Sequence, residues 1–260
     1  MRTQMPIVLA QTLRACRFIA SNFWGLVALL VLWEVWVRWN DLNAIVMPYP
    51  VSVLEDVLHN PTLYLRNTLQ TFGLALAGLL VGLVVGTLLA ILTWSSKTLS
   101  GLLTPLALIF ASVPVVALIP VLARLFGYDV KTVIVIVTII SFFPSFVFTA
   151  AGLRMLPPGS ADFFAVAGAS TWRRLTLLAI PAAIPNWMLA LRLAAANSML
   201  AAMVAEFLMG VSGLGNMFHA ATNDLDMQRA LGASLVAMAI SVALYAATGV
   251  LSDLVKRRWE

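Results

Sequence analysis

Charged residues are scarce in this sequence: Asp, Glu, Lys and Arg make up only 10% of its 260 residues. A typical soluble domain has about 25%, so a chain with so few charges could not cover a water-facing surface of this size. Hydrophobic residues make up 62%, and the mean hydropathy is +0.97. Because the apolar residues are spread along the whole chain, the composition predicts an all-α membrane protein with several spans rather than one anchor.

Residues that could support catalysis or metal binding are also few. The single cysteine, Cys16, has no partner for an internal disulfide. The two histidines, His59 and His219, are far apart and have no cluster of Cys, Asp or Glu beside them, so we expect no metal site. No nucleophile and base are arranged as in an enzyme, so no catalytic residue is assigned. No basic strip alternates with aromatic residues, which argues against nucleic acid as a partner.

Six stretches of the chain are long and apolar enough to cross a bilayer, which requires roughly 20 residues. They are Ser21–Arg38, Leu69–Trp94, Leu102–Phe126, Val133–Leu153, Ile184–Met209 and Ala230–Leu251. The first follows Arg2, Arg14 and Arg17, as the apolar run of a signal peptide would. Its length, and the lack of a small-residue cleavage site after it, favour a retained first span. The sequence therefore predicts about six transmembrane helices.

Lys and Arg are unevenly distributed between the two ends of these spans. With the N-terminus inside, the inner side holds Arg2, Arg14, Arg17, Lys97, Arg154, Arg173, Arg174, Lys256, Arg257 and Arg258. The outer side holds Arg38, Arg66, Arg124, Lys131 and Arg229, together with most of the acidic residues. Because Lys and Arg are enriched in cytoplasmic loops, both termini are predicted to be cytoplasmic. On the outer side, Ser52–His59 is expected to form a short helix.

Glycines recur at four-residue spacing in the second span, at Gly78, Gly82 and Gly86. Residues with this spacing share one helix face and allow another helix to approach closely. The pattern favours internal packing, with a face that slides between transport states as the alternative.

Prolines are concentrated in the third span, at Pro105, Pro114 and Pro120, and the fourth span contains Pro144. Proline removes a helical hydrogen bond and kinks or breaks the helix. In lipid the freed carbonyls need partners in protein or in a water-lined cavity. The pattern predicts either structural kinks or residues that line a pore.

The inner loop, residues 154–183, has helix signals of its own. Ser160 is expected to cap a short helix over Asp162–Ala167, and Gly168 is expected to end it in a left-handed conformation. A second amphipathic helix is predicted over Thr171–Ile180, with Pro181 and Pro185 leading into the fifth span. Since a loop of this size exceeds what a connection requires, we interpret it as a docking element for a cytoplasmic partner.

The inner loop resembles the EAA loop of ABC importer permeases, which has an acid-Ala-Ala triplet, then a glycine, and an aliphatic-x-Leu-Pro ending. Asp162 stands at the acidic position and Gly168 at the glycine, while two phenylalanines replace the small alanines. The resemblance implies that this loop is a coupling element for an ATPase. The residues it assigns to that contact are Asp162, Phe163, Phe164, Ala165, Gly168, Ala169, Ser170 and Pro181.

Other segments resemble the nitrate/sulfonate/taurine-type permeases, in the same order along the chain. They are LWEVWVR at Leu32–Arg38, MPYPVSVLEDVL at Met47–Leu58, SVPVVALIPVLARLFGYDVKT in the third span and its outer turn, and LRLAAANSMLAAMVAEFLMGVSGLGNMF in the fifth. The resemblance implies a type I ABC importer permease fold in a bacterial cytoplasmic (inner) membrane. The expected organisation is a cytoplasmic segment 1–20, one transmembrane permease domain 21–252 and a basic cytoplasmic tail 253–260.

The resembled family implies a division of labour among subunits. Two copies of an ABC ATPase would bind the inner loops, a second permease copy would complete the path as a homodimer, and an extracytoplasmic solute-binding protein would deliver the solute. This chain has no G-x-x-x-x-G-K-[ST] loop for phosphates, so ATP and Mg would bind the partner ATPase and no cofactor is expected in this chain. The solute class would be sulfonate, taurine, nitrate, bicarbonate or a vitamin precursor.

Polar residues inside the fifth span are candidates for the translocation path, because ionisable groups in a membrane usually face water or the protein interior. They are Arg192, Asn197, Ser198 and Glu206. The alternative is that the two charged side chains pair with neighbouring helices or extend to the membrane surface. An ion-coupled secondary transporter is the alternative function. It would predict inverted repeats and several intramembrane carboxylates, and neither is visible.

Overall fold

The computed structural model describes residues 24–256, and all regular structure in that range is helical. The α-helices are α2 (Trp24–Trp39), α3 (Pro50–His59), α4 (Pro61–Ser95), α5 (Lys97–Ser112), α6 (Val115–Phe126), α7 (Val130–Arg154), α8 (Ser160–Val166), α9 (Thr171–Arg174), α10 (Ile180–Met209), α11 (Leu214–Asn223) and α12 (Met227–Lys256). A π-helical turn, η1 (Leu175–Ala179), joins α9 to α10. The segment 1–20, the start of the first span and residues 257–260 lie outside the described residues.

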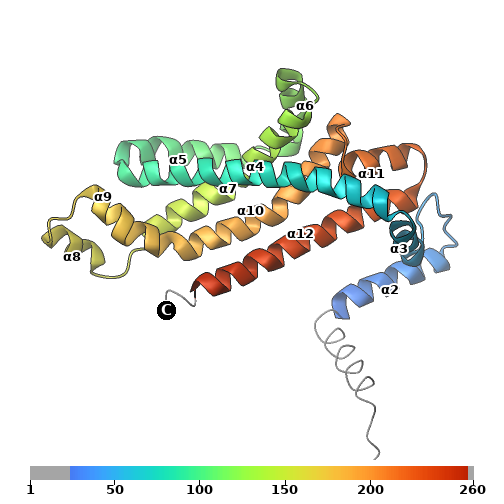
Figure 1. The fold of residues 1–260 in the computed structure, drawn as a ribbon, viewed down its shortest axis with the longest axis horizontal. Coiled ribbons are helices and arrows are strands. Elements are labelled where there is room, and N and C mark those ends of the chain that lie inside the picture. Colours follow the sequence, from blue (N-terminus) through green and yellow to red (C-terminus); the bar gives the residue numbers. More distant parts are fainter. Residues whose placement is uncertain (1–23, 257–260) are drawn as a thin grey trace, which may run out of the picture.

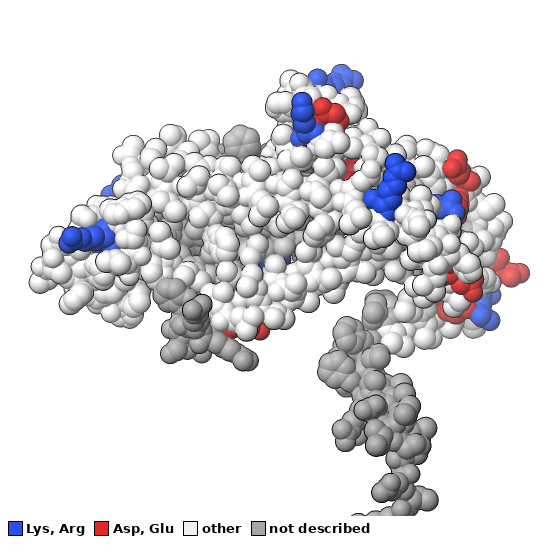
Figure 2. All heavy atoms as spheres, viewed as in Figure 1, with Lys and Arg blue, Asp and Glu red and all other residues white. Residues whose placement is uncertain are grey.

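Four helices are long and apolar enough to cross a membrane: Pro61–Ser95, Val130–Arg154, Thr171–Met209 and Met227–Val255. They confirm the second, fourth, fifth and sixth predicted spans. They run roughly side by side, with α8 and α9 at one end of the molecule and α3 and α11 at the other (Figure 1). Charged side chains gather near the two ends and around α6, whereas the flank between them is almost free of charge in this view (Figure 2). This distribution suits a slab of hydrocarbon around the middle of the molecule.

The first predicted span corresponds to α2, whose 16 described residues are less than a full crossing. Within the described chain α2 contacts α3 and projects away from the main bundle (Figure 1). Several of its large apolar side chains, among them Leu29, Leu32 and Trp36, are more than half exposed, whereas Val37 is buried. This helix is therefore available to lipid or to another subunit along most of its length.

The third predicted span, Leu102–Phe126, is wrong as a single helix. The chain forms α5 up to Ser112 and a separate helix, α6, from Val115. Pro114 precedes α6 with an extended ψ of 107°. Proline has no N–H to continue the helical hydrogen bonds, and it disfavours helical geometry in the residue before it. Pro105 and Pro120 are accommodated inside α5 and α6, so the break occurs at only one of the three prolines.

The glycine face of α4 packs directly against α7, which confirms the predicted role in internal packing. A Cβ added at Gly82 would lie 2.7 Å from the Ser141 Cβ, and one at Gly86 would lie 2.7 Å from the Ser145 Cβ. The close approach lets the Ser145 hydroxyl donate a 3.0 Å hydrogen bond to the Leu83 carbonyl on α4. Since lipid supplies little hydrophobic drive between helices, such close packing and interhelical hydrogen bonds hold them together.

Replacing Gly82 by leucine is expected to destabilise the protein by about 3 kcal/mol, because the added side chain must separate α4 from α7. The matched control is Gly73→Leu on the same helix, where an added Cβ meets no atom within 4 Å. That change should leave stability unchanged or slightly raised, since leucine favours helix more than glycine does. Thermal unfolding of both purified variants in detergent measures the difference. Equal losses in the two variants would contradict the packing role.

Candidate functional site

The inner loop is folded around a short helix with a glycine-dependent end. After Val166, the last residue of α8, Gly168 adopts a φ of +65°. The Ala169 N–H donates to the Phe164 carbonyl at 3.0 Å, and the Gly168 N–H donates to the Ala165 carbonyl at 3.1 Å. These two bonds form a Schellman motif, which needs the left-handed residue that glycine supplies. The predicted termination at Gly168 is confirmed.

The start of this helix differs from the sequence prediction. The helix begins at Ser160 itself, and the residue before it, Gly159, is the N-cap with a φ of +75°. The Ser160 hydroxyl donates backwards to the Pro157 carbonyl at 2.6 Å. The Ser160 side chain therefore faces the preceding turn rather than capping the helix. The left-handed conformation of Gly159 lets the chain turn sharply where the helix begins.

Three large apolar side chains at the tip of the inner loop are mostly exposed. Phe163 is 69% exposed, Val166 is 90% exposed and Trp172 is 70% exposed. The rings of Phe163 and Phe164 meet edge to face with centroids 5.8 Å apart. A rim of aromatic and aliphatic groups outside the predicted membrane region is typical of a protein interface.

The second amphipathic helix, predicted over Thr171–Ile180, is not a separate element. The chain is helical from Thr171 to Met209 without interruption. The Ser170 hydroxyl caps the start, accepting from the Arg173 N–H at 3.4 Å. Pro181 lacks the N–H that an α-helix would use at this position, and the wider π-helical turn immediately before it absorbs the mismatch. Movement of the loop would therefore be transmitted directly to α10.

Glu206 lies in the last turn of α10, at the end predicted to face outside, and is fully buried. Its Oε2 accepts hydrogen bonds from the Thr71 hydroxyl on α4 at 2.8 Å and from the Gly215 N–H at 2.9 Å. The Thr71 oxygen in turn accepts from the Leu214 N–H at 2.8 Å. This arrangement, which we call the outer clasp, is defined by Glu206, Thr71, Leu214 and Gly215. It favours the interpretation in which Glu206 pairs with neighbouring helices.

Glycine is required at the turn that surrounds this carboxylate. Gly213 has a φ of +149°, and a Cβ there would run into the Glu206 carboxyl group. A Cβ at Gly215 would run into the Met203 carbonyl. The Gly-Leu-Gly sequence thus lets the backbone close around Glu206 and places the first turn of α11 against α10.

Thr71 was missed by sequence reasoning, because a threonine in an apolar run carries no signal of its distant partner.

The other polar candidates on α10 are in different environments. The guanidinium of Arg192 lies 3.8 Å from the ring centroid of Tyr245 on α12. Ser198 is 1% exposed and donates to the Ala195 carbonyl of its own helix at 2.9 Å. Asn197 is exposed and lines an open groove of about 380 Å³ between α10 and α12. The groove is lined by Ala196, Asn197, Leu200, Met203, Ser234, Ala237, Met238 and Ser241.

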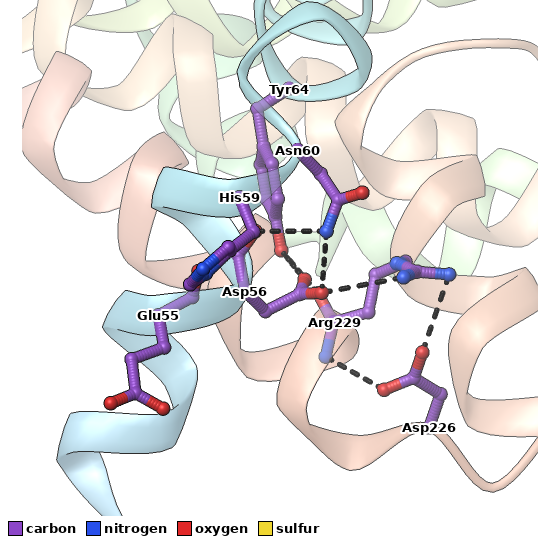
Figure 3. Close-up of polar contacts among 7 residues, drawn as sticks. All are labelled: Glu55, Asp56, His59, Asn60, Tyr64, Asp226 and Arg229. Atoms are coloured by element: carbon purple, nitrogen blue, oxygen red, sulfur yellow. Dashed lines mark hydrogen bonds and ion pairs between the residues drawn. The ribbon is translucent and has the colours of Figure 1, made fainter.

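A second polar cluster joins α3, α4 and α12 (Figure 3). The Tyr64 hydroxyl on α4 donates to the Asp56 carboxylate on α3 at 2.6 Å. The Arg229 guanidinium on α12 pairs with Asp56 and with Asp226, both at 3.3 Å. Asn60 adds a 2.9 Å bond to Asp56. The cluster joins α3 to the first turns of α4 and α12, and sequence reasoning did not anticipate it.

Within residues 24–256, no group of three or more His, Cys, Asp or Glu is placed to hold a metal ion. The long apolar helices, two polar clusters at one end and an exposed helical loop at the other define a multi-pass membrane protein.

Comparisons with known proteins identify the family. Residues 78–260 match the family described as "Binding-protein-dependent transport system inner membrane component". A probable ABC transporter permease of Haemophilus influenzae is 29% identical over 217 residues, covering 84% of this chain and 89% of the relative. A putative aliphatic sulfonates transport permease of Bacillus subtilis is 28% identical, covering 73% and 69%. Other relatives are named as permeases for riboflavin, nitrate and bicarbonate.

The fold matches a solved structure of the MetNI methionine ABC transporter in an inward-facing conformation. The TM-score is 0.65 at 16% identity, and the match covers 77% of this chain and 99% of that chain. The chain therefore belongs to the family of inner membrane components of binding-protein-dependent transport systems. It is an ABC importer permease, which confirms the resemblance found in the sequence, and it is a transport component rather than an enzyme. The family implies an ATPase and a binding protein as partners.

Proposed function

We propose that the inner loop of this permease docks into an ABC ATPase. The single observation that carries the proposal is the rim of Phe163, Val166 and Trp172, which is 69–90% exposed beyond the ends of the spans. The residues assigned to the contact are Asp162, Phe163, Phe164, Ala165, Gly168, Ala169, Ser170 and Pro181. Asp162 and the two phenylalanines lie on α8, Gly168 fixes the turn after it, and Ser170 caps the helix that continues into α10.

We infer that each ATPase of a pair binds the loop of one permease copy, and that two copies of this chain enclose the path. In that arrangement both termini and the loop face the cytoplasm. The direct helical connection from Thr171 to Met209 supports a lever mechanism. When ATP closes the ATPases, a displaced α8 would tilt α10 and alter the groove between α10 and α12. ATP and Mg would remain on the ATPase.

The groove between α10 and α12 is the part of the proposed path that the described residues support best. Asn197, Ser234 and Ser241 bring neutral hydrogen-bonding groups into an otherwise apolar lining. Arg192 lies on the same pair of helices and holds a positive charge against Tyr245. A small polar or anionic solute, such as the sulfonate, nitrate or bicarbonate named for the relatives, suits such a path. Ser198 and Glu206, both buried, would act by supporting α10.

The experiment that tests the function is uptake into liposomes that contain the permease, with the ATPase inside and the binding protein outside. Uptake should require internal ATP and the binding protein. Uptake driven by an ion gradient without the ATPase would instead support a secondary transporter. The binding protein's ligand supplies the solute for this assay.

In the same liposomes, Asn197→Cys in a Cys16→Ser background should lose more than about 90% of uptake after treatment with a thiol reagent, because the modified side chain fills the groove. The control is Leu80→Cys, which is 54% exposed on the α4 surface and should keep its uptake. Inhibition of the two variants to the same extent would remove Asn197 from the path.

A further inference from the structure

A cavity with a basic lining lies where α4 ends, α5 begins and α7 ends. Its volume is about 500 Å³, and it is lined by Thr93, Trp94, Lys97, Ser100, Gly101 and Arg154. Thr93 is buried, Trp94 is half-buried, and the two cationic side chains are exposed at the mouth. No part of the inner loop assigned to ATPase docking lines this cavity, and the transport path does not use it.

The charge of this cavity favours an anion. Lys97 and Arg154 line it, and none of its lining residues is acidic. The Arg154 guanidinium donates one hydrogen bond, at 2.6 Å, to the Ser100 hydroxyl. This contact orients the planar group, which has further N–H donors for a phosphate. Lys97 is the first residue of the 16-residue helix α5, whose N-terminal N–H groups also favour negative charge.

A separate apolar groove lies further along the same helix. It has a volume of about 440 Å³, and its lining includes Leu103, which is within one helical turn of Ser100 and Gly101. Its lining is formed entirely by aliphatic and aromatic side chains from α4, α5, α6 and α7, with Leu106, Phe142 and Phe146 among them. A basic cavity followed by an apolar groove has the chemistry of a lipid with an anionic headgroup. A free phosphate would use only the first part.

We propose that the basic cavity and the apolar groove, which are neighbours along α5, together form a binding site for an anionic phospholipid. The headgroup phosphate lies between Lys97 and Arg154, and an acyl chain follows α5 towards Leu106. The proposal rests on the proposed orientation, in which this end of the spans faces the cytoplasmic leaflet, where basic pockets between helices bind anionic headgroups. Because Arg154 is both the last residue of α7 and the first residue of the inner loop, an occupied site would fix the start of that loop relative to α5.

The test is native mass spectrometry of the purified full-length permease with added phosphatidylglycerol or phosphatidylcholine. We expect preferential binding of phosphatidylglycerol. A cationic side chain near the membrane surface contributes about fivefold in lipid affinity. Lys97→Gln and Arg154→Gln should each weaken binding by that factor, and the double variant by about 25-fold. The matched control is Lys131→Gln with Arg124→Gln, which removes one exposed Lys and one exposed Arg near the opposite ends of the spans and should leave binding unchanged.

Inorganic phosphate distinguishes the two sources of the anion. Displacement of the lipid by millimolar phosphate would indicate a free-anion site and overturn the lipid assignment. Equal binding of the two lipids, or unchanged binding by the double variant, would also overturn it. Since this measurement needs neither the ATPase nor transport, its failure is distinguishable from failure of the proposed docking function. Loss of ATPase binding with lipid binding intact would contradict only the proposed docking function.

Discussion

Replacement of Phe163 by aspartate should abolish stable association with the ATPase and reduce ATP-driven uptake at least 100-fold. Phe163 is 69% exposed and lies on α8, beyond the membrane-spanning helices. If the ring inserts into a pocket of the ATPase, its loss removes roughly 1.5–3 kcal/mol of apolar burial. The introduced carboxylate adds the cost of placing a charge in an apolar contact. Together these two costs exceed the roughly 2.7 kcal/mol that corresponds to a hundredfold loss of affinity.

Co-purification with the ATPase from native membranes in mild detergent measures this association directly. The matched control is Phe126→Asp, a second exposed phenylalanine at the end of α6, which is 57% exposed. It carries the same chemical change on a different helix, so it should leave the association intact. Retention of the ATPase by the Phe163 variant, at the level of the control, would exclude this ring from the interface. A melting temperature equal to that of the unmodified protein would establish that the variant is folded.

Local signals in the sequence predicted much of this fold. Four spans followed from continuous apolar runs, and the end of α8 followed from Gly168, because only a residue tolerant of positive φ closes a Schellman motif readily. The short outer helix predicted over Ser52–His59 is α3, which begins two residues earlier at Pro50. Proline is favoured at the first helical position, so the error is at the boundary only.

The errors arose where the outcome depended on geometry rather than composition. Three prolines in one run gave no basis for choosing Pro114 as the single break. The prolines near Ile180 suggested a helix end, whereas the π-helical turn carries the helix through. A residue pattern does not reveal how a neighbouring turn will absorb a missing hydrogen bond.

The polar clusters were beyond sequence reasoning for a different reason. The outer clasp joins Thr71 to Glu206, which are 135 residues apart, and the second cluster joins Asp56 to Arg229 across 173 residues. Pairings over such separations depend on the packing of α4, α10 and α12. The sequence made Glu206 a candidate for the translocation path and left pairing with a neighbouring helix as the alternative, but it did not show which residue would be the partner. The exposed inner loop was easier to predict because its helix and turn are local.

Replacement of Glu206 by alanine should destabilise the permease by about 3 kcal/mol, because it leaves the Gly215 N–H without its acceptor and opens a cavity. The Thr71 hydroxyl would keep only its 3.1 Å bond to the Asn67 carbonyl. The freed turn around Gly213 should then let α11 move, so uptake should fall together with stability. The measurement is thermal or denaturant unfolding of the purified protein in detergent. The matched control is Glu55→Ala, which removes an exposed glutamate from α3 at the same end of the molecule and should change stability by less than about 0.5 kcal/mol.

The conservative change separates support of α11 from a role of the charge in transport. Glu206 Oε1 has no hydrogen-bond partner among the described residues, whereas Oε2 accepts both bonds of the clasp. In Glu206→Gln the amide oxygen can take the place of Oε2, so most of the lost stability should return. Thr71→Val should resemble the alanine variant, since it removes the acceptor for the Leu214 N–H. A stable glutamine variant with normal uptake would assign Glu206 to the outer clasp. A stable variant without uptake would assign its charge to the solute path.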